Sequence, residues 1–98
     1  MVVFAVIAPA PEDRLDAAVK ASFPDNYFVI APGQYLVADS RATTAEIAER
    51  VGASGGGVGK IFITPVPNYA GWHDKDMWEW IAARTSGIAP APPAARHG

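Results

Sequence analysis

Residues 27–37 read YFVIAPGQYLV, two short apolar runs on either side of Pro32-Gly33. Short runs rich in aromatic and β-branched residues favour strands. Proline presets the backbone at the first turn position and glycine accepts positive φ at the next, so the pair predicts an antiparallel hairpin. This hairpin supplies two neighbouring strands of one sheet.

One strand and one helix are expected before the hairpin. Residues 2–8 form a short, β-branched apolar run closed by Pro9. No basic stretch precedes this run and it is too short to span a bilayer, so we interpret it as a buried strand rather than a leader. Residues 11–23 then predict an amphipathic helix, which Pro11 starts and Pro24 ends.

A second helix and a fourth strand are expected after the hairpin. Thr43 and Glu46 have the spacing of a capping box, and Gly52 suits the end of the helix. Residues 58–64 carry the apolar run of a strand that Pro65 ends. The order strand, helix, strand, strand, helix, strand is that of ferredoxin-like α+β domains, in which two helices cover one face of a four-stranded antiparallel sheet.

The C-terminal part divides into a third helix and a tail. Asp74 is a candidate N-cap for a helix that runs to about residue 84. Its apolar stripe consists of Met77, Trp78 and Ile81. This helix is the available cover for the second face of the sheet, which would otherwise meet water or another copy of the chain. We expect a single domain over residues 1–84 and a disordered Pro- and Ala-rich tail over residues 85–98.

The composition and net charge of the chain exclude several classes of function. The chain has 98 residues, of which 50% are hydrophobic and 18% charged, with a net charge of −2 and no cysteine. The negative charge argues against a protein that coats duplex nucleic acid. The absence of cysteine excludes disulfides, thiol nucleophiles and thiolate metal sites. We expect a cytoplasmic protein without a membrane partner.

Two motifs invite a catalytic interpretation, and both lack required residues. Residues 54–60 (SGGGVGK) look like a phosphate-binding loop, but the first glycine and the hydroxyl residue after the lysine are missing. Residues 73–76 combine His73 with two carboxylates. The chain has one other histidine, His97, so a three-ligand zinc site cannot be assembled and helix capping is the simpler interpretation. We expect no metal and no cofactor.

Aromatic side chains gather just before and within the third helix. The four rings belong to Tyr69, Trp72, Trp78 and Trp80. Trp80 lies about 200° around the helix from Trp78, so we expect that the two indoles cannot enter the same core. Core packing, contact with a protein partner and stacking on nucleic-acid bases are the roles open to these rings. We take all four as candidate interface residues, with Trp72 and Trp80 as the anchors.

This pattern resembles a known family. Residues 59–63 (GKIFI) are followed by YAGW at residues 69–72 and WEWI at residues 78–81. Together with the strand of residues 2–8 and the element order, they resemble small Cas-two-like proteins, relatives of the small CRISPR adaptation subunit, some of which are labelled SinR-like. The likeness covers residues 1–82. It implies a ferredoxin-like protomer that dimerises through its sheet, with the segment after the fourth strand contributing to the interface.

The chain departs from that family at one position that matters for chemistry. The enzymatic members carry an aspartate at the end of the first strand, where acids of two protomers can hold a divalent metal over a phosphodiester. This chain reads Ile7-Ala8-Pro9 there. The resemblance therefore assigns a catalytic role to no residue.

Three function classes follow from these observations. We expect a non-catalytic homodimeric interaction or scaffold protein, which could also bind an unidentified protein partner. The alternative is a nucleic-acid-binding protein or a divalent-metal-dependent nuclease of the same fold, which would need a basic groove. The third is a small-ligand binder that uses the cleft between the sheet and the C-terminal helix. Dimerisation, salt dependence and ligand-dependent melting distinguish the three.

Overall fold

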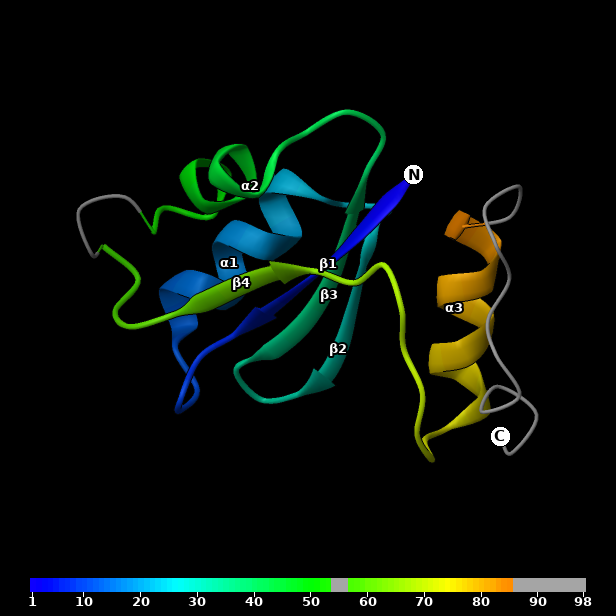
Figure 1. The fold of residues 1–98 in the computed structure, drawn as a ribbon. Coiled ribbons are helices and arrows are strands. Elements are labelled where there is room, and N and C mark those ends of the chain that lie inside the picture. Colours follow the sequence, from blue (N-terminus) through cyan, green and yellow to red (C-terminus); the bar gives the residue numbers. More distant parts are fainter. Residues whose placement is uncertain (54–56, 86–98) are drawn as a thin grey trace.

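The computed structural model describes residues 1–53 and 57–85, which form a sheet with helices on both sides (Figure 1). The elements are β1 (Val2–Ile7), α1 (Asp13–Ser22), β2 (Tyr27–Ala31), β3 (Gln34–Asp39), α2 (Thr44–Arg50), β4 (Phe62–Pro65) and α3 (Lys75–Thr85). The predicted order of strands and helices is confirmed. Of the expected tail, residue 85 belongs to α3, and residues 86–98 lie outside the described part, as do residues 54–56 of the glycine-rich connection.

The four strands form one antiparallel sheet in the order β2-β3-β1-β4. β1 and β3 are central, and β2 and β4 are the edges. Phe4 of β1 lies between Val37 of β3 and Pro65 of β4. Because successive side chains of a strand point to opposite faces, Phe4 enters one face of the sheet and Val3 the other. The chain is therefore a small α+β domain, as expected.

The turn between β2 and β3 requires glycine at residue 33. Gly33 has φ +84°, and a Cβ there would lie 2.9 Å from the carbonyl oxygen of Ala10. Residues other than glycine rarely adopt this backbone conformation, and the nearby carbonyl oxygen leaves no space for a Cβ atom. The N–H of Ala8 donates to the Gly33 carbonyl oxygen at 2.8 Å, so the hairpin turn also holds the chain as it leaves β1.

Local signals determine where α1 and α2 begin. The predicted capping box is present: Thr43 Oγ1 accepts from the N–H of Glu46 at 3.1 Å, and Glu46 Oε1 accepts from the N–H of Thr43 at 2.8 Å. The first turn of α1 holds Asp13 and Asp16, which favour the positive end of the helix dipole. Within the described ranges, no helix is long and apolar enough to cross a membrane.

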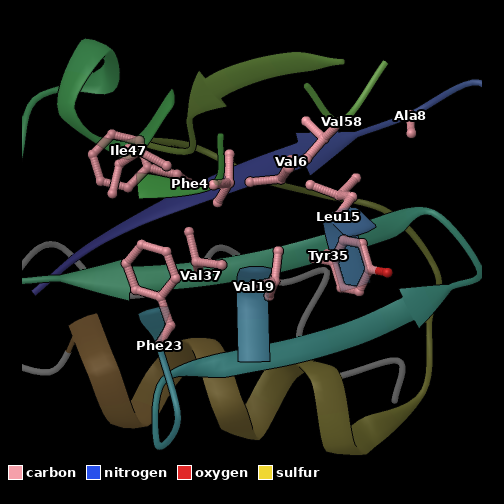
Figure 2. Packing of buried hydrophobic residues seen from close by; sticks show 11 residues of the cluster. Phe4, Val6, Ala8, Leu15, Val19, Phe23, Tyr35, Val37, Ile47 and Val58 are labelled. Atoms are coloured by element: carbon pink, nitrogen blue, oxygen red, sulfur yellow. The ribbon is translucent and has the colours of Figure 1, made fainter. Parts of the chain in front are cut away.

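One hydrophobic core lies between the sheet and the pair α1 and α2. Figure 2 shows side chains from the strands and from both helices meeting in this layer. The buried members are Phe4, Val6, Ala8, Leu15, Val19, Phe23, Tyr35, Val37, Ile47, Val51 and Val58. The amphipathic stripe predicted for the first helix is confirmed, since Leu15 and Val19 are fully buried.

α3 lies on the opposite face of the sheet from α1 and α2 (Figure 1), and a second core lies between it and the sheet. Its buried members are Val3, Leu36, Ala38, Met77, Trp78 and Ile81. The predicted stripe of the third helix is thus confirmed, and the C-terminal segment covers the second face of the sheet. Where α3 packs, that face is closed to a second copy of the chain.

Candidate functional site

Tyr69 and Trp78, two of the predicted interface residues, pack together in the α3 layer. Trp78 is 5% exposed. Its ring stacks on that of Tyr69, with centroids 5.8 Å apart and an angle of 19° between the ring planes. The Trp78 indole is therefore part of the core, and a partner could reach it only if α3 left the sheet.

Trp80 lies at the flank of the same layer, where it is partly buried. Its ring centroid is 6.1 Å from that of Phe28 on β2. The expectation that Trp78 and Trp80 cannot enter the same core needs correction, because both belong to one apolar layer. The wide indole of Trp80 reaches Phe28 from the side of α3, although it lies far around the helix from Trp78.

Arg84 holds the end of α3 against the start of β2. Its guanidinium lies 4.1 Å from the centroid of the Trp80 ring. The same group donates to Asn26 Oδ1 at 3.1 Å and to the carbonyl oxygen of Asp25 at 2.9 Å. It also donates to the carbonyl oxygen of Trp80 at 3.2 Å, so one side chain covers an aromatic ring and satisfies three acceptors. We conclude that Arg84 has a structural role in fixing the helix.

Trp72 is at the surface, on the connection between β4 and α3. Its side chain is 76% exposed, the largest fraction among the large hydrophobic residues. The structure therefore brings Tyr69 and Trp78 together, places Trp80 at the flank, and leaves Trp72 in contact with solvent. The four aromatic residues do not share one environment.

An apolar cleft of about 190 Å³ opens beside Tyr69, between the start of β1 and the end of α3. Its lining consists of Met1, Val2, Val3, Val66, Pro67, Tyr69 and Thr85. Among the residues that the structure describes, the buried Tyr69 hydroxyl and Trp78 Nε1 have no hydrogen-bond partner. This cleft is where the small-ligand hypothesis would place a ligand.

Carboxylates gather around a second hollow, close to the end of β1. It measures about 250 Å³ and is lined by Pro11, Glu12, Asp13, Asp16, Val29, Pro32, Gly33 and Tyr35. The Tyr35 hydroxyl donates to Asp16 Oδ1 at 2.9 Å, and Lys20 Nζ lies 2.9 Å from Asp16 Oδ2. Sequence reasoning missed this cluster because Asp16 and Tyr35 are 19 residues apart.

The contacts in this hollow keep Asp16 charged. The hydrogen bonds from Lys20 and then Tyr35 hold the pKa of Asp16 below its usual value. Burial, followed by the bond to Asp16, raises the pKa of Tyr35 to about 12. Glu12 is paired with Arg14 at 3.2 Å. The described residues include no group of three or more His, Asp or Glu side chains that could hold a metal ion.

His73 and Asp74 lie at the start of α3. The N–H of Asp74 donates to His73 Nδ1 at 2.8 Å, and the carbonyl oxygen of Asp74 accepts from the N–H of Met77 at 3.1 Å. Asp76 lies in the first turn, at the positive end of the helix dipole. This arrangement fits the helix-start interpretation. His97 lies outside the described residues.

Phe62 and Ile7 form an exposed apolar pair that sequence reasoning missed. They lie directly opposite one another on β4 and β1, and are 65% and 36% exposed. Ile61 and Ile63, the neighbours of Phe62, pack against the first core instead. Strand alternation within residues 61–63 could have shown that one of three consecutive apolar side chains points away from α1 and α2.

Comparisons with family models, with curated proteins and with solved structures find no match to this chain. The relation to Cas-two-like proteins, and the function expected from it, are therefore proposals.

Proposed function

We propose that this chain is a non-catalytic, homodimeric interaction or scaffold protein of the cytoplasm, with a ferredoxin-like fold of the Cas-two-like type. The observation that carries the proposal is the exposure of Phe62 beside Ile7 on the sheet. The two side chains are contiguous, and contiguous exposed apolar patches mark surfaces that another protein covers. Burial would stabilise the contact by roughly 25 cal/mol per Å² of apolar surface.

The strand arrangement supports the ferredoxin-like part of the proposal. β3 lies between β1 and β2, so the first strand, first helix and second strand form a split unit with another strand inserted. α1 and α2 pack on the same face, as that fold requires. α3 is the added element.

The residues around the end of β1 support a non-catalytic role. Ile7-Ala8-Pro9 offers no carboxylate where the nuclease members of the family carry one. The nearby carboxylate of Asp16 is already bound by Tyr35 and Lys20. A divalent metal ion prefers several oxygen ligands that are free to converge on it.

The basic side chains are mostly engaged within the chain. Acidic partners lie 2.9–3.7 Å from Arg14, Lys20, Arg50 and Lys75. Arg84 is held by Trp80, Asn26 and Asp25. A nucleic-acid interface draws its affinity from cations that meet phosphates, and these cations would have to exchange a carboxylate for a phosphate.

The molar mass of the wild-type protein, measured by light scattering as it elutes from a size-exclusion column, tests the homodimer. We expect a mass of 20.6 kDa, which is twice the 10.3 kDa of one chain. The mass should fall toward that of one chain on dilution. A mass of one chain at every concentration would refute the homodimer.

A gel series tests the non-catalytic part. Purified protein is mixed with labelled RNA, single-stranded DNA and duplex DNA, in magnesium and in chelator. We expect neither a shift nor cleavage. Cleavage that chelator abolishes would restore the nuclease alternative, and a salt-sensitive shift would restore nucleic-acid binding.

A further inference from the structure

Among residues 1–53 and 57–85, the outward backbone groups of β4 have no backbone hydrogen-bond partner. The N–H of Val66 donates to the carbonyl oxygen of Val3 at 2.8 Å. Backbone groups of an antiparallel strand point alternately to its two sides, so the N–H and C=O groups of Phe62 and Thr64 also face β1. The backbone groups of Ile61, Ile63 and Pro65 then point away from β1, toward the open edge. The only hydrogen bond on this edge within residues 57–85 comes from the Thr64 hydroxyl, which donates to the Pro65 carbonyl oxygen at 3.2 Å.

The other edge of the sheet is protected. The register of β2 shifts between Val29 and Ala31, and such an irregularity disturbs regular pairing with an added strand. Arg84 binds the residues that precede β2. β4 has neither device, although it is only four residues long and Pro65 removes one outward donor at its end. It also has no charged residue between Lys60 and Asn68, although charged side chains are the usual protection of an exposed edge.

We propose that two copies of this chain pair their β4 strands antiparallel, about a two-fold axis at Ile63, and so join two four-stranded sheets into one. This inference rests on the proposed homodimer and names its interface. Each Ile63 N–H donates to the carbonyl oxygen of the partner's Ile63. Each Ile61 N–H donates to the carbonyl oxygen of the partner's Pro65, which retains a lone pair beside its bond from Thr64.

The position of Pro65 excludes registers centred nearer to it. Proline lacks an N–H, so it is tolerated only where no donor is needed or at the end of a pairing. Centring on Ile63 places Pro65 at the last pair, where only its carbonyl oxygen is used. A shift toward Pro65 would put the missing donors at the centre of the interface.

The side chains favour a second copy over another partner. In this register each Phe62 lies opposite the partner's Thr64, so both exposed rings pack over the joined sheet, next to Ile7. Each copy carries a net charge of −2, so repulsion between two copies is smallest where they meet at a surface without acidic residues. The β4 edge is such a surface, and a two-fold axis makes it complementary to itself.

The first test compares Phe62→Asp with Val29→Asp by light scattering at about 10–300 µM, because a short interface predicts a weak dimer. Both side chains are exposed, 65% and 43%, and both lie on edge strands. We expect Phe62→Asp to raise the dimer dissociation constant by about tenfold or more, because two carboxylates would replace buried rings. Val29→Asp should dimerise like the wild type. Circular dichroism checks that both variants are folded.

The second test uses the absence of native cysteine. Phe62→Cys and Thr64→Cys are prepared as separate proteins, mixed and oxidised. The proposed register places residues 62 and 64 of different copies opposite one another as a non-hydrogen-bonded pair, with Cα atoms about 4.5 Å apart, within the range of a disulfide. The same residues of two copies lie about 8 Å apart, beyond that range. We expect the mixture to cross-link, and each protein alone to remain uncross-linked.

The outcomes separate the two proposals. A wild type that stays monomeric overturns both the homodimer and this interface. A dimeric wild type whose Phe62→Asp variant also dimerises, with no mixed cross-link, overturns only the β4 pairing and leaves a homodimer with another interface. Loss of the dimer in Phe62→Asp alone, together with the mixed cross-link, supports both.

Discussion

Asp39, the last residue of β3, fixes the connection to α2 through three hydrogen bonds. Its carboxylate accepts from the N–H of Arg41 at 3.0 Å, from the N–H of Ala42 at 2.7 Å and from Arg50 Nη1 at 2.9 Å. These bonds, led by that of Arg41, lower the pKa of Asp39 from 3.8 to about 2. The charged form is therefore the one that the folded chain favours.

The lowered pKa of Asp39 predicts how the free energy of unfolding depends on pH. The unfolded chain binds a proton at Asp39 more readily than the folded chain, so the contribution of Asp39 is complete above about pH 5 and is lost as the pH falls through about 2. We expect a loss of about 1 kcal/mol, after allowing for the solvent exposure of the Arg50 partner. Asp16, whose pKa is also lowered, adds to the loss in the same direction.

Urea unfolding from pH 7 to pH 2 measures the effect. Asp39→Asn is the matched variant, since its side-chain oxygen can still accept a hydrogen bond but has no charge to lose. The stability of this variant should fall less steeply between pH 4 and pH 2 than that of the wild type. An identical slope would show that Asp39 does not carry the dependence.

At the scale of the element, α3 shows why aromatic residues of one segment differ in role. Trp78 is 5% exposed and Trp72 is 76% exposed, six residues apart. We expect Trp78→Ala to lower the free energy of unfolding by about 3–5 kcal/mol, because a large buried ring is removed. Trp72→Ala should change it by less than about 0.5 kcal/mol. Urea unfolding monitored by circular dichroism provides both values, and equal values would contradict the placement of α3.

Much of the fold follows from local signals. Thr43 and Glu46 predict the start of α2, and Pro32-Gly33 predicts the hairpin, because each pair acts on backbone groups a few residues away. The environment of Trp80 does not follow from helix geometry alone, because it depends on how far α3 lies across β2. The exposure of Phe62 is of the same kind: alternation gives its face, and only the position of α3 shows that this part of the face stays uncovered.

The candidate sites depend still more on tertiary structure. Asp16 and Tyr35 meet only because α1 packs on β3, so no local pattern could predict their hydrogen bond. The aromatic segment was visible in the sequence, but its division between core and surface was not. The interface proposed here lies on β4, outside the four aromatic residues that the sequence suggested.

In the part of the chain that the structure describes, helices cover both faces of the sheet, and the β4 edge has no neighbouring strand. A chain of 98 residues buries a modest core, so an added contact between copies would contribute appreciably to its stability. Joining two sheets at β4 would satisfy the outward backbone groups and cover Phe62 in one step.

Amide hydrogen exchange at Ile63, followed by NMR on the wild-type chain at several concentrations, is the sharpest test of pairing between β4 strands. The Ile63 N–H points away from β1, so in a monomer it exchanges with solvent. If β4 pairs between copies, protection of the Ile63 N–H increases with protein concentration, while protection of the Val66 N–H, which is bonded to Val3 within the chain, changes much less. Exchange at Ile63 that is independent of concentration, over a range in which the mass doubles, would contradict pairing at β4.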